Sequence, residues 1–173
     1  SAEKLHTPSE DSVNTAKEAA LPTNIYIIGS ESAIRGDQIY ANYGLKYSQV
    51  ANLADKMKEA NPDKITVEFI DPDLNPAFVS QYPEDNLTSG TVLVQTDRRY
   101  KVLTVGDLFS VQQDQNTGAQ KSFSKVDGAL ANAVYLANLE TVPVVAVATG
   151  HEEMLETNAR AGFDKLLADN AFE

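Results

Sequence analysis

Three consecutive residues, His151, Glu152 and Glu153, are the side chains best suited to chemistry in this chain. They follow an apolar run, residues 142–148, that predicts a buried strand. In open α/β sheets ligands gather beyond the carboxyl ends of strands, so an imidazole and two carboxylates there could bind a metal ion or act as acid and base. The competing interpretation is structural, because the helix dipole also favours acidic residues at a helix start. An HExxH motif is absent, since position 155 is Leu155.

Arg98 and Arg99 are the main basic pair of an otherwise acidic chain. They lie between two β-branched and aromatic runs, residues 91–95 and 100–105, whose separation suits an antiparallel hairpin. At the tip of such a hairpin the two guanidinium groups could form a docking point for a partner. The alternative is a solvated turn without a ligand.

Asp71, Asp73 and Asn75 match the first three ligands of a calcium-binding EF-hand loop. That loop also requires glycine at its sixth position and glutamate at its twelfth. Pro76 and Tyr82 occupy those positions here. A turn followed by a helix with Asn75 at its N-cap and Pro76 in its first turn explains the same residues.

Other chemistries are excluded by what the sequence lacks. It contains no cysteine, which removes disulfides, thiolate metal sites, cysteine nucleophiles and CxxC redox chemistry. Neither phosphate-binding glycine motif is present, and the GxSxG hydrolase elbow is also missing. The formal net charge of -11 disfavours nucleic acid and anionic lipid as partners. We therefore predict no cofactor and no catalytic or metal-binding residue.

The elements that would position these side chains alternate between strands and helices. Residues 24–28, 65–70, 91–95, 100–105 and 142–148 predict strands. Residues 47–60 have apolar positions at i, i+3, i+4 and i+7, which is typical of a helix packed on a sheet. Shorter signals predict helices over residues 76–82 and 156–170. A further helix is expected to open at Ser124 with a capping box through Asp127.

This order predicts an α/β chain of two segments. Residues 1–22 are expected to be a tail or linker, with a short helix over residues 14–21 as the alternative. Residues 23–110 are expected to form the first domain. Residues 111–123 are expected to be a polar connector, with a small hairpin at the Asn-Thr-Gly turn signal of residues 116–118 as the alternative. Residues 124–173 are expected to start a second, Rossmann-like α/β segment that ends incomplete. Tyr40, Tyr43 and Tyr47 are expected to cover the sheet rather than to form a recognition surface.

The β-α-β-α-β-β order of residues 24–105 resembles the thioredoxin fold. That fold's redox proteins have a CxxC motif after the first strand, and this chain has no counterpart. The resemblance therefore implies the fold and not the redox chemistry.

A closer resemblance is to the ABC-type transport auxiliary family, which includes GldG-like gliding-motility proteins. The similar segments are V-E-F-I-D-P-D-L-N-P at residues 67–76, S-G-T-V-L-V at residues 89–94, D-G-A-L-A-N-A at residues 127–133, and P-V-V-A-V-A-T-G-H-E-E at residues 143–153. The family typically has a Gly-His-Gly-Glu-like turn, whereas Gly150 is followed here by His151, Glu152 and Glu153.

The resemblance implies a non-catalytic bacterial domain on the extracytoplasmic side of a membrane. Its expected partners are the permease and ATPase subunits of the same system. Contact with the membrane is expected through anchors outside this chain, which begins at Ser1 without methionine and which we expect to be an excised segment. The alternative function is a hydrolase or amidotransferase-like enzyme with a site around His151 and Glu153.

Overall fold

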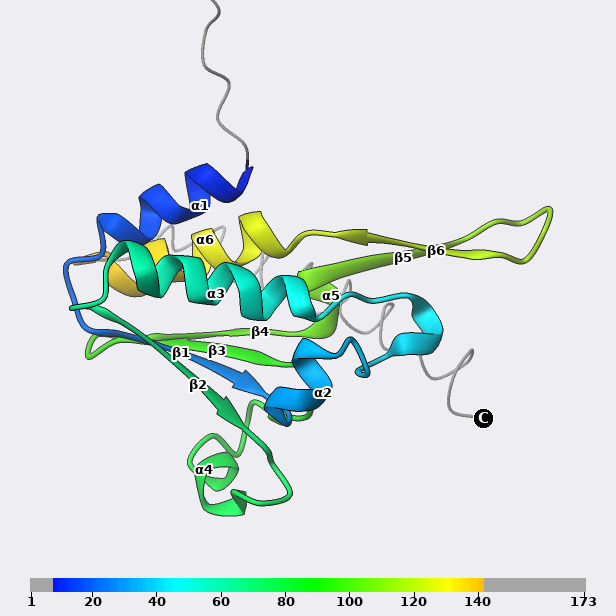
Figure 1. The fold of residues 1–173 in the computed structure, drawn as a ribbon. Coiled ribbons are helices and arrows are strands. Elements are labelled where there is room, and N and C mark those ends of the chain that lie inside the picture. Colours follow the sequence, from blue (N-terminus) through cyan, green and yellow to red (C-terminus); the bar gives the residue numbers. More distant parts are fainter. Residues whose placement is uncertain (1–7, 142–173) are drawn as a thin grey trace, which may run out of the picture. The chain divides into compact units, whose positions relative to one another are not determined.

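A computed structural model describes residues 8–141, and its centre is a four-stranded mixed sheet (Figure 1). The strand order is β2-β1-β3-β4, with β1 parallel to β2 and antiparallel to β3. β3 and β4 form an antiparallel hairpin. This arrangement of helices around a mixed sheet confirms the predicted α/β class. The strand bounds are Thr23–Ile28 (β1), Ile65–Ile70 (β2), Val92–Gln95 (β3) and Tyr100–Leu103 (β4).

Two long helices cover one face of the sheet (Figure 1). These are α3 (Ser48–Ala60) and α6 (Val126–Asn138). The predicted stripe of α3 is its packing face, because Val50, Leu53, Ala54 and Met57 are all buried. Central strand residues meet these helices, and Ile25, Ile27, Val92 and Val94 have no exposed surface. Each Å² of apolar area buried on this face stabilises the fold by ~25 cal/mol.

The opposite face is covered near the end of β2 by a short helix, α4 (Pro76–Ser80) (Figure 1). Tyr82 and Leu87 pack there against Ile28 and Leu93 from the sheet. Phe78 adds an aromatic contact to Tyr26, with ring centroids 4.8 Å apart. Aromatic side chains from the α4 region therefore seal this part of the sheet.

The turn before α4 is held by its own polar groups. The Asp71 carboxylate accepts a hydrogen bond from the Asp73 N–H at 3.0 Å. Asn75 takes the N-cap position of α4, but its side chain donates to the Asp71 carbonyl instead of capping the helix. These hydrogen bonds therefore support the interpretation of Asp71, Asp73 and Asn75 as a turn before a helix.

The segment after β1 contains a short helix, α2 (Glu31–Arg35), and a 3-10 turn, η1 (Ala41–Tyr43). Tyr43 and Tyr47 are buried, as expected of core cover. The Tyr47 hydroxyl donates to the Gly90 carbonyl at 2.7 Å. Gly90 has φ +96°, and a Cβ there would lie 2.9 Å from that hydroxyl, so this position requires glycine.

A second, two-stranded sheet follows the hairpin. Thr104 and Asp107 form a capping box that opens α5 (Val105–Leu108). The chain then enters β5 (Phe109–Gln113) and returns along β6 (Gln120–Ser124). The predicted polar connector of residues 111–123 is thus mostly a β-hairpin, whose turn contains the Asn-Thr-Gly signal of residues 116–118.

Two predicted boundaries differ from the structure. Residues 8–17 of the expected tail form α1 (Pro8–Lys17), which packs against α3 and α6. The chain divides into units of residues 1–138 and 139–173, so α6 belongs to the first unit and does not begin a second segment at residue 124. The reason is packing, because Leu130, Ala133 and Val134 of α6 are fully buried. The predicted strand 142–148 and helix 156–170 lie outside the described residues.

Candidate functional site

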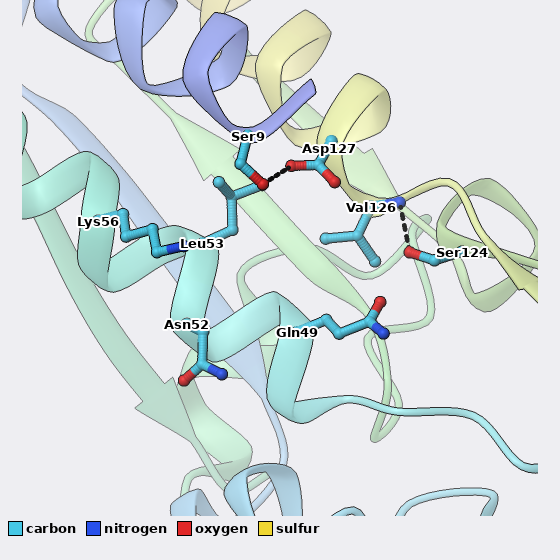
Figure 2. Close-up of a pocket in the computed structure, with 8 residues that line it drawn as sticks. All are labelled: Ser9, Gln49, Asn52, Leu53, Lys56, Ser124, Val126 and Asp127. Atoms are coloured by element: carbon cyan, nitrogen blue, oxygen red, sulfur yellow. Dashed lines mark hydrogen bonds between the residues drawn. The ribbon is translucent and has the colours of Figure 1, made fainter. Parts of the chain in front are cut away.

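A polar pocket of about 420 Å³ lies where α1, α3 and the start of α6 meet (Figure 2). Pockets of this size can hold a small molecule. Its lining combines two carboxamides, two hydroxyls, one ammonium and one carboxylate with two apolar side chains. These residues are Ser9, Gln49, Asn52, Leu53, Lys56, Ser124, Val126 and Asp127.

One stripe of α3 supplies half of the pocket. Gln49, Asn52 and Lys56 are spaced three and four residues apart, which places them on the same side of the helix. Leu53 lies on that side too, but it is buried and contributes an apolar wall. Asn52 and Lys56 are exposed, so this side of the pocket is open to water.

Asp127 links the pocket's other two helices. Its Oδ1 accepts a hydrogen bond from the Ser9 hydroxyl at 2.9 Å (Figure 2). Its backbone carbonyl accepts a second bond, also 2.9 Å, from the buried Ser12 hydroxyl. The capping box predicted through Ser124 and Asp127 has a different form: the Ser124 hydroxyl accepts from the Val126 N–H at 3.3 Å, while the Asp127 carboxylate reaches α1.

The pocket's described lining is suited to hydrogen bonding and not to proton transfer by imidazole or attack by a thiolate. Neither histidine nor cysteine is among its lining residues. Ser9, the hydroxyl next to the carboxylate, donates to Asp127 directly without an intervening base. A nucleophile–base–orienter arrangement is therefore not formed by these residues. What the observed bonds do is tie α1 to α6.

The structure places Arg98 and Arg99 at the end of α6. Arg98 Nη1 donates to the Asn138 carbonyl at 2.9 Å, and Arg99 Nη1 donates to the Leu136 carbonyl. Thr96, at the same hairpin tip, donates to the Ala137 carbonyl at 2.6 Å. The last carbonyls of a helix lack partners within the helix and carry partial negative charge, so cations are stabilising there. Both arginines thus have a structural role that neither sequence-based interpretation included.

Asn138 completes this attachment of α6 to the sheet. Its side-chain amide donates to the Thr23 hydroxyl at 3.1 Å, and its Oδ1 accepts from the Leu21 N–H at 3.0 Å. Thr23 is fully buried at the start of β1. The C-terminus of α6 is therefore fixed to both β1 and the β3–β4 hairpin.

His151, Glu152 and Glu153 lie outside the described residues, so the predicted acid–base or metal site there stays a prediction. Within residues 8–141, no three histidine, cysteine, aspartate or glutamate side chains are grouped so that they could hold a metal ion. In the same part of the chain, the helices are all too short or too polar to cross a bilayer.

The end of β1 is where thioredoxin-fold redox proteins have their CxxC motif. Here Ile28 is followed by Gly29, with φ +139°, and by Ser30. The Ser30 hydroxyl accepts a hydrogen bond from the Ala33 N–H at 3.2 Å and so caps α2. At the position of that motif, this chain therefore has the N-cap of α2.

Sequence patterns did not identify the pocket. Gln49, Asn52 and Lys56 form the polar side of an amphipathic helix, a pattern shared by most surface helices. Ser9 lies in the segment predicted to be a tail. The spacing of three and four residues is the one signal that could have grouped the α3 side chains.

No family model matches this chain, and neither does any curated protein.

Proposed function

We propose that this chain is a non-catalytic auxiliary domain of a bacterial ABC transport system. It acts on the extracytoplasmic side of the membrane and binds the permease and ATPase-containing complex of that system. The full-length protein is held at the membrane by anchors outside this chain.

The observation that carries the proposal is a thioredoxin-like sheet without redox residues. At the end of β1, Gly29 and Ser30 make a turn and a helix cap. The chain as a whole has no cysteine. In redox proteins of the thioredoxin fold the residues after the first strand are reactive, whereas here they form a turn and a helix cap. Such a domain is suited to binding through its surface.

The order of the similar segments also supports the proposal. Residues 67–76 cover most of β2, the acidic turn and the first residue of α4. Residues 89–94 lead into β3, and residues 127–133 lie in α6. Three of the four segments that resemble the transport family thus belong to one sheet and its covering helix, and the fourth, residues 143–153, lies outside the described residues.

Co-purification tests the partnership. The full-length protein would be expressed with the permease and ATPase encoded beside its gene, solubilised in mild detergent and isolated through a tag on the permease. We expect the auxiliary protein to be retained with this complex and lost when an unrelated ABC permease carries the tag. Equal retention by both complexes, or by neither, would contradict the proposal.

Two further measurements test the proposed location of the domain and its proposed lack of catalytic activity. Protease added to intact spheroplasts should cleave the domain, whereas protection in spheroplasts and cleavage in inverted vesicles would place it in the cytoplasm. The variant His151→Ala should bind the complex as well as the natural chain does. A hydrolytic activity that disappears in this variant would favour the enzymatic alternative.

A further inference from the structure

The β5–β6 hairpin projects beyond the four-stranded sheet (Figure 1). Its base is anchored, because Phe109 and Val111 are buried and the Phe109 ring lies 5.0 Å from that of Tyr47. Beyond this base every residue from 112 to 121 is exposed. We call residues 112–121 the arm.

The tip of the arm has a defined shape. The Asp114 N–H donates to the Ala119 carbonyl, and the Gly118 N–H donates to the Asp114 carbonyl, both at 2.8 Å. The Asp114 carboxylate accepts from the Asn116 N–H at 2.8 Å, which lowers the pKa of this carboxyl. The arm is therefore an ordered ribbon with a closed turn.

Hydrogen-bond alternation fixes which backbone groups point outward. The residue pairs at the two ends of the ladder are hydrogen-bonded through the backbone. The Lys125 N–H donates to the Leu108 carbonyl, and the Asp114 N–H donates to the Ala119 carbonyl. Bonded pairs alternate with non-bonded ones in an antiparallel ribbon. Gln113 and Gln120 face each other in a non-bonded pair, so their backbone N–H and C=O groups point away from each other, toward opposite edges.

These two edges have few features that prevent strand addition. Natural edge strands are commonly protected by proline, charged side chains or bulges. Residues 109–124 contain no proline, their ladder is a continuous register of paired residues, and Lys121 is the one basic side chain. A ribbon of two strands is marginally stable in water, and additional strands stabilise it. Next to the arm, the Ser122 hydroxyl of β6 donates to the Gly44 carbonyl at 3.2 Å, so among the described residues the exposed stretch of both edges is the arm itself.

Charge indicates the partner. Asp114 and Lys121 are the charged residues of the hairpin from 109 to 124, so its net charge is zero while the whole chain has -11. Two copies that paired their arms antiparallel would keep their acidic bodies about one arm length apart. The arm has two strand residues on each side before its turn, 112–113 and 120–121, which at ~3.4 Å per residue extend it by roughly 7 Å, close to the Debye length of ~8 Å at physiological ionic strength. Contact through other surfaces would bring two acidic bodies together.

We propose that the arm pairs edge to edge with the arm of a second copy of this chain. One edge of each hairpin meets the same edge of the other in a two-fold arrangement, and the two ribbons form a four-stranded antiparallel sheet. Such a contact is self-complementary, as a symmetric dimer requires. It buries little area, so the dimer is weak and forms as the concentration rises.

A matched pair of variants tests this dimer. Gln113→Pro and Gln120→Pro change the same residue type in the same cross-strand pair, and each removes an outward N–H from a different edge. Proline is tolerated where the N–H of an edge strand faces solvent, so each isolated hairpin should persist. Sedimentation equilibrium of the whole chain over a wide concentration range would give the dimer dissociation constant.

We expect the natural chain to dimerise and one of the two variants to raise the dissociation constant by about tenfold or more. The other variant should dimerise normally, which identifies the edge in use. A natural chain that stays monomeric at all concentrations would overturn the proposal, and so would equal effects of the two variants. As a measurement without substitutions, amide exchange at Gln113 and Gln120 should slow at high concentration for one residue of the pair and not for the other; unchanged exchange at both would also overturn it.

Discussion

Helices α3 and α1 lie on the same side of the molecule, but different interactions hold them. α3 buries five apolar side chains against the sheet and α6. α1 buries Ser12 and Ala16, and the hydroxyl groups of Ser9 and Ser12 donate hydrogen bonds to Asp127 of α6. Its C-terminal end is held by Asn61, whose side-chain amide donates to the carbonyl of Ala16 at 3.0 Å and also lies within hydrogen-bond distance of the Lys17 and Ala19 carbonyls.

The comparison shows that two helices of similar length can be stabilised by different interactions. Burial of apolar area stabilises α3 without depending on any single contact, and it leaves a periodic pattern in the sequence. α1 depends on a few directional bonds from distant residues, so each bond has a larger share in its stability. A shallow surface depression of about 360 Å³ also lies beside α1 and is lined in part by Val13 and Lys17.

The largest expected effect is in α3. Met57 is fully buried, and Met57→Ala removes its side chain from the core. We expect a loss of about 2–5 kcal/mol in the free energy of unfolding, measured by denaturant titration. Lys58→Ala on the exposed side of the same helix is the control, with a change within about 0.5 kcal/mol. Similar losses for both variants would mean that apolar burial does not hold α3.

A smaller loss is expected where Asn61 holds α1. Asn61→Ala leaves the last carbonyls of α1 without their side-chain donor and should cost about 1–3 kcal/mol. Amide exchange should accelerate in α1 more than in α3, because α1 detaches locally. Asn61→Asp keeps the side-chain shape but removes the N–H donor, so its loss of unfolding free energy should be at least as large as that of Asn61→Ala. Uniform acceleration across both helices would contradict local detachment.

The other end of α1 should contribute less. Ser9→Ala removes one bond to the Asp127 carboxylate, which is only partly buried. We expect a loss of about 1 kcal/mol or less in unfolding free energy. In a double-mutant cycle with Asp127→Ala the two losses should not add, since each variant removes the same bond. Additive losses would show that the Ser9–Asp127 bond contributes nothing.

The smallest effect concerns the start of α3 and depends on pH. Asp37 Oδ1 accepts from the Ser48 N–H at 2.8 Å, and this backbone hydrogen bond lowers the pKa of the carboxyl. The ionised group therefore contributes stability above its unfolded pKa of about 3.9, and that contribution is lost as the pH falls through the lower folded pKa. Asp37→Asn preserves the left-handed backbone at this position, where φ is +55°.

The natural chain should be more stable than Asp37→Asn at neutral pH by about 0.3–1 kcal/mol, toward the lower value because solvent screens the group. The difference should shrink as the solution is acidified below about pH 4. Urea titrations of both chains at several pH values measure it. A difference that does not change with pH would show that the charge of Asp37 has no part in it.

Much of the fold could be predicted because its elements are local patterns. The runs at residues 24–28 and 65–70 became β1 and β2 within one residue, and the stripe of residues 47–60 became α3. By contrast, the segment of α1 was expected to be a tail, or a short helix over residues 14–21, because its partners, Asn61 and Asp127, are far away in the sequence. Of the candidate site residues, Arg98 and Arg99 were found as a pair, yet their bonds to α6 depend on how the hairpin meets that helix.

Sequence alone determined the order of the four strands of the main sheet and of α3, α4 and α6, together with the absence of thiol chemistry, because periodicity and residue type are properties of the chain itself. Tertiary structure decided that α6 belongs to the first unit, that α1 is a helix, and that the arginine pair stabilises a helix end. Each of these results depends on hydrogen bonds or burial between residues separated by tens of positions. Such contacts exist once the sheet has brought those residues together, and no local pattern encodes them.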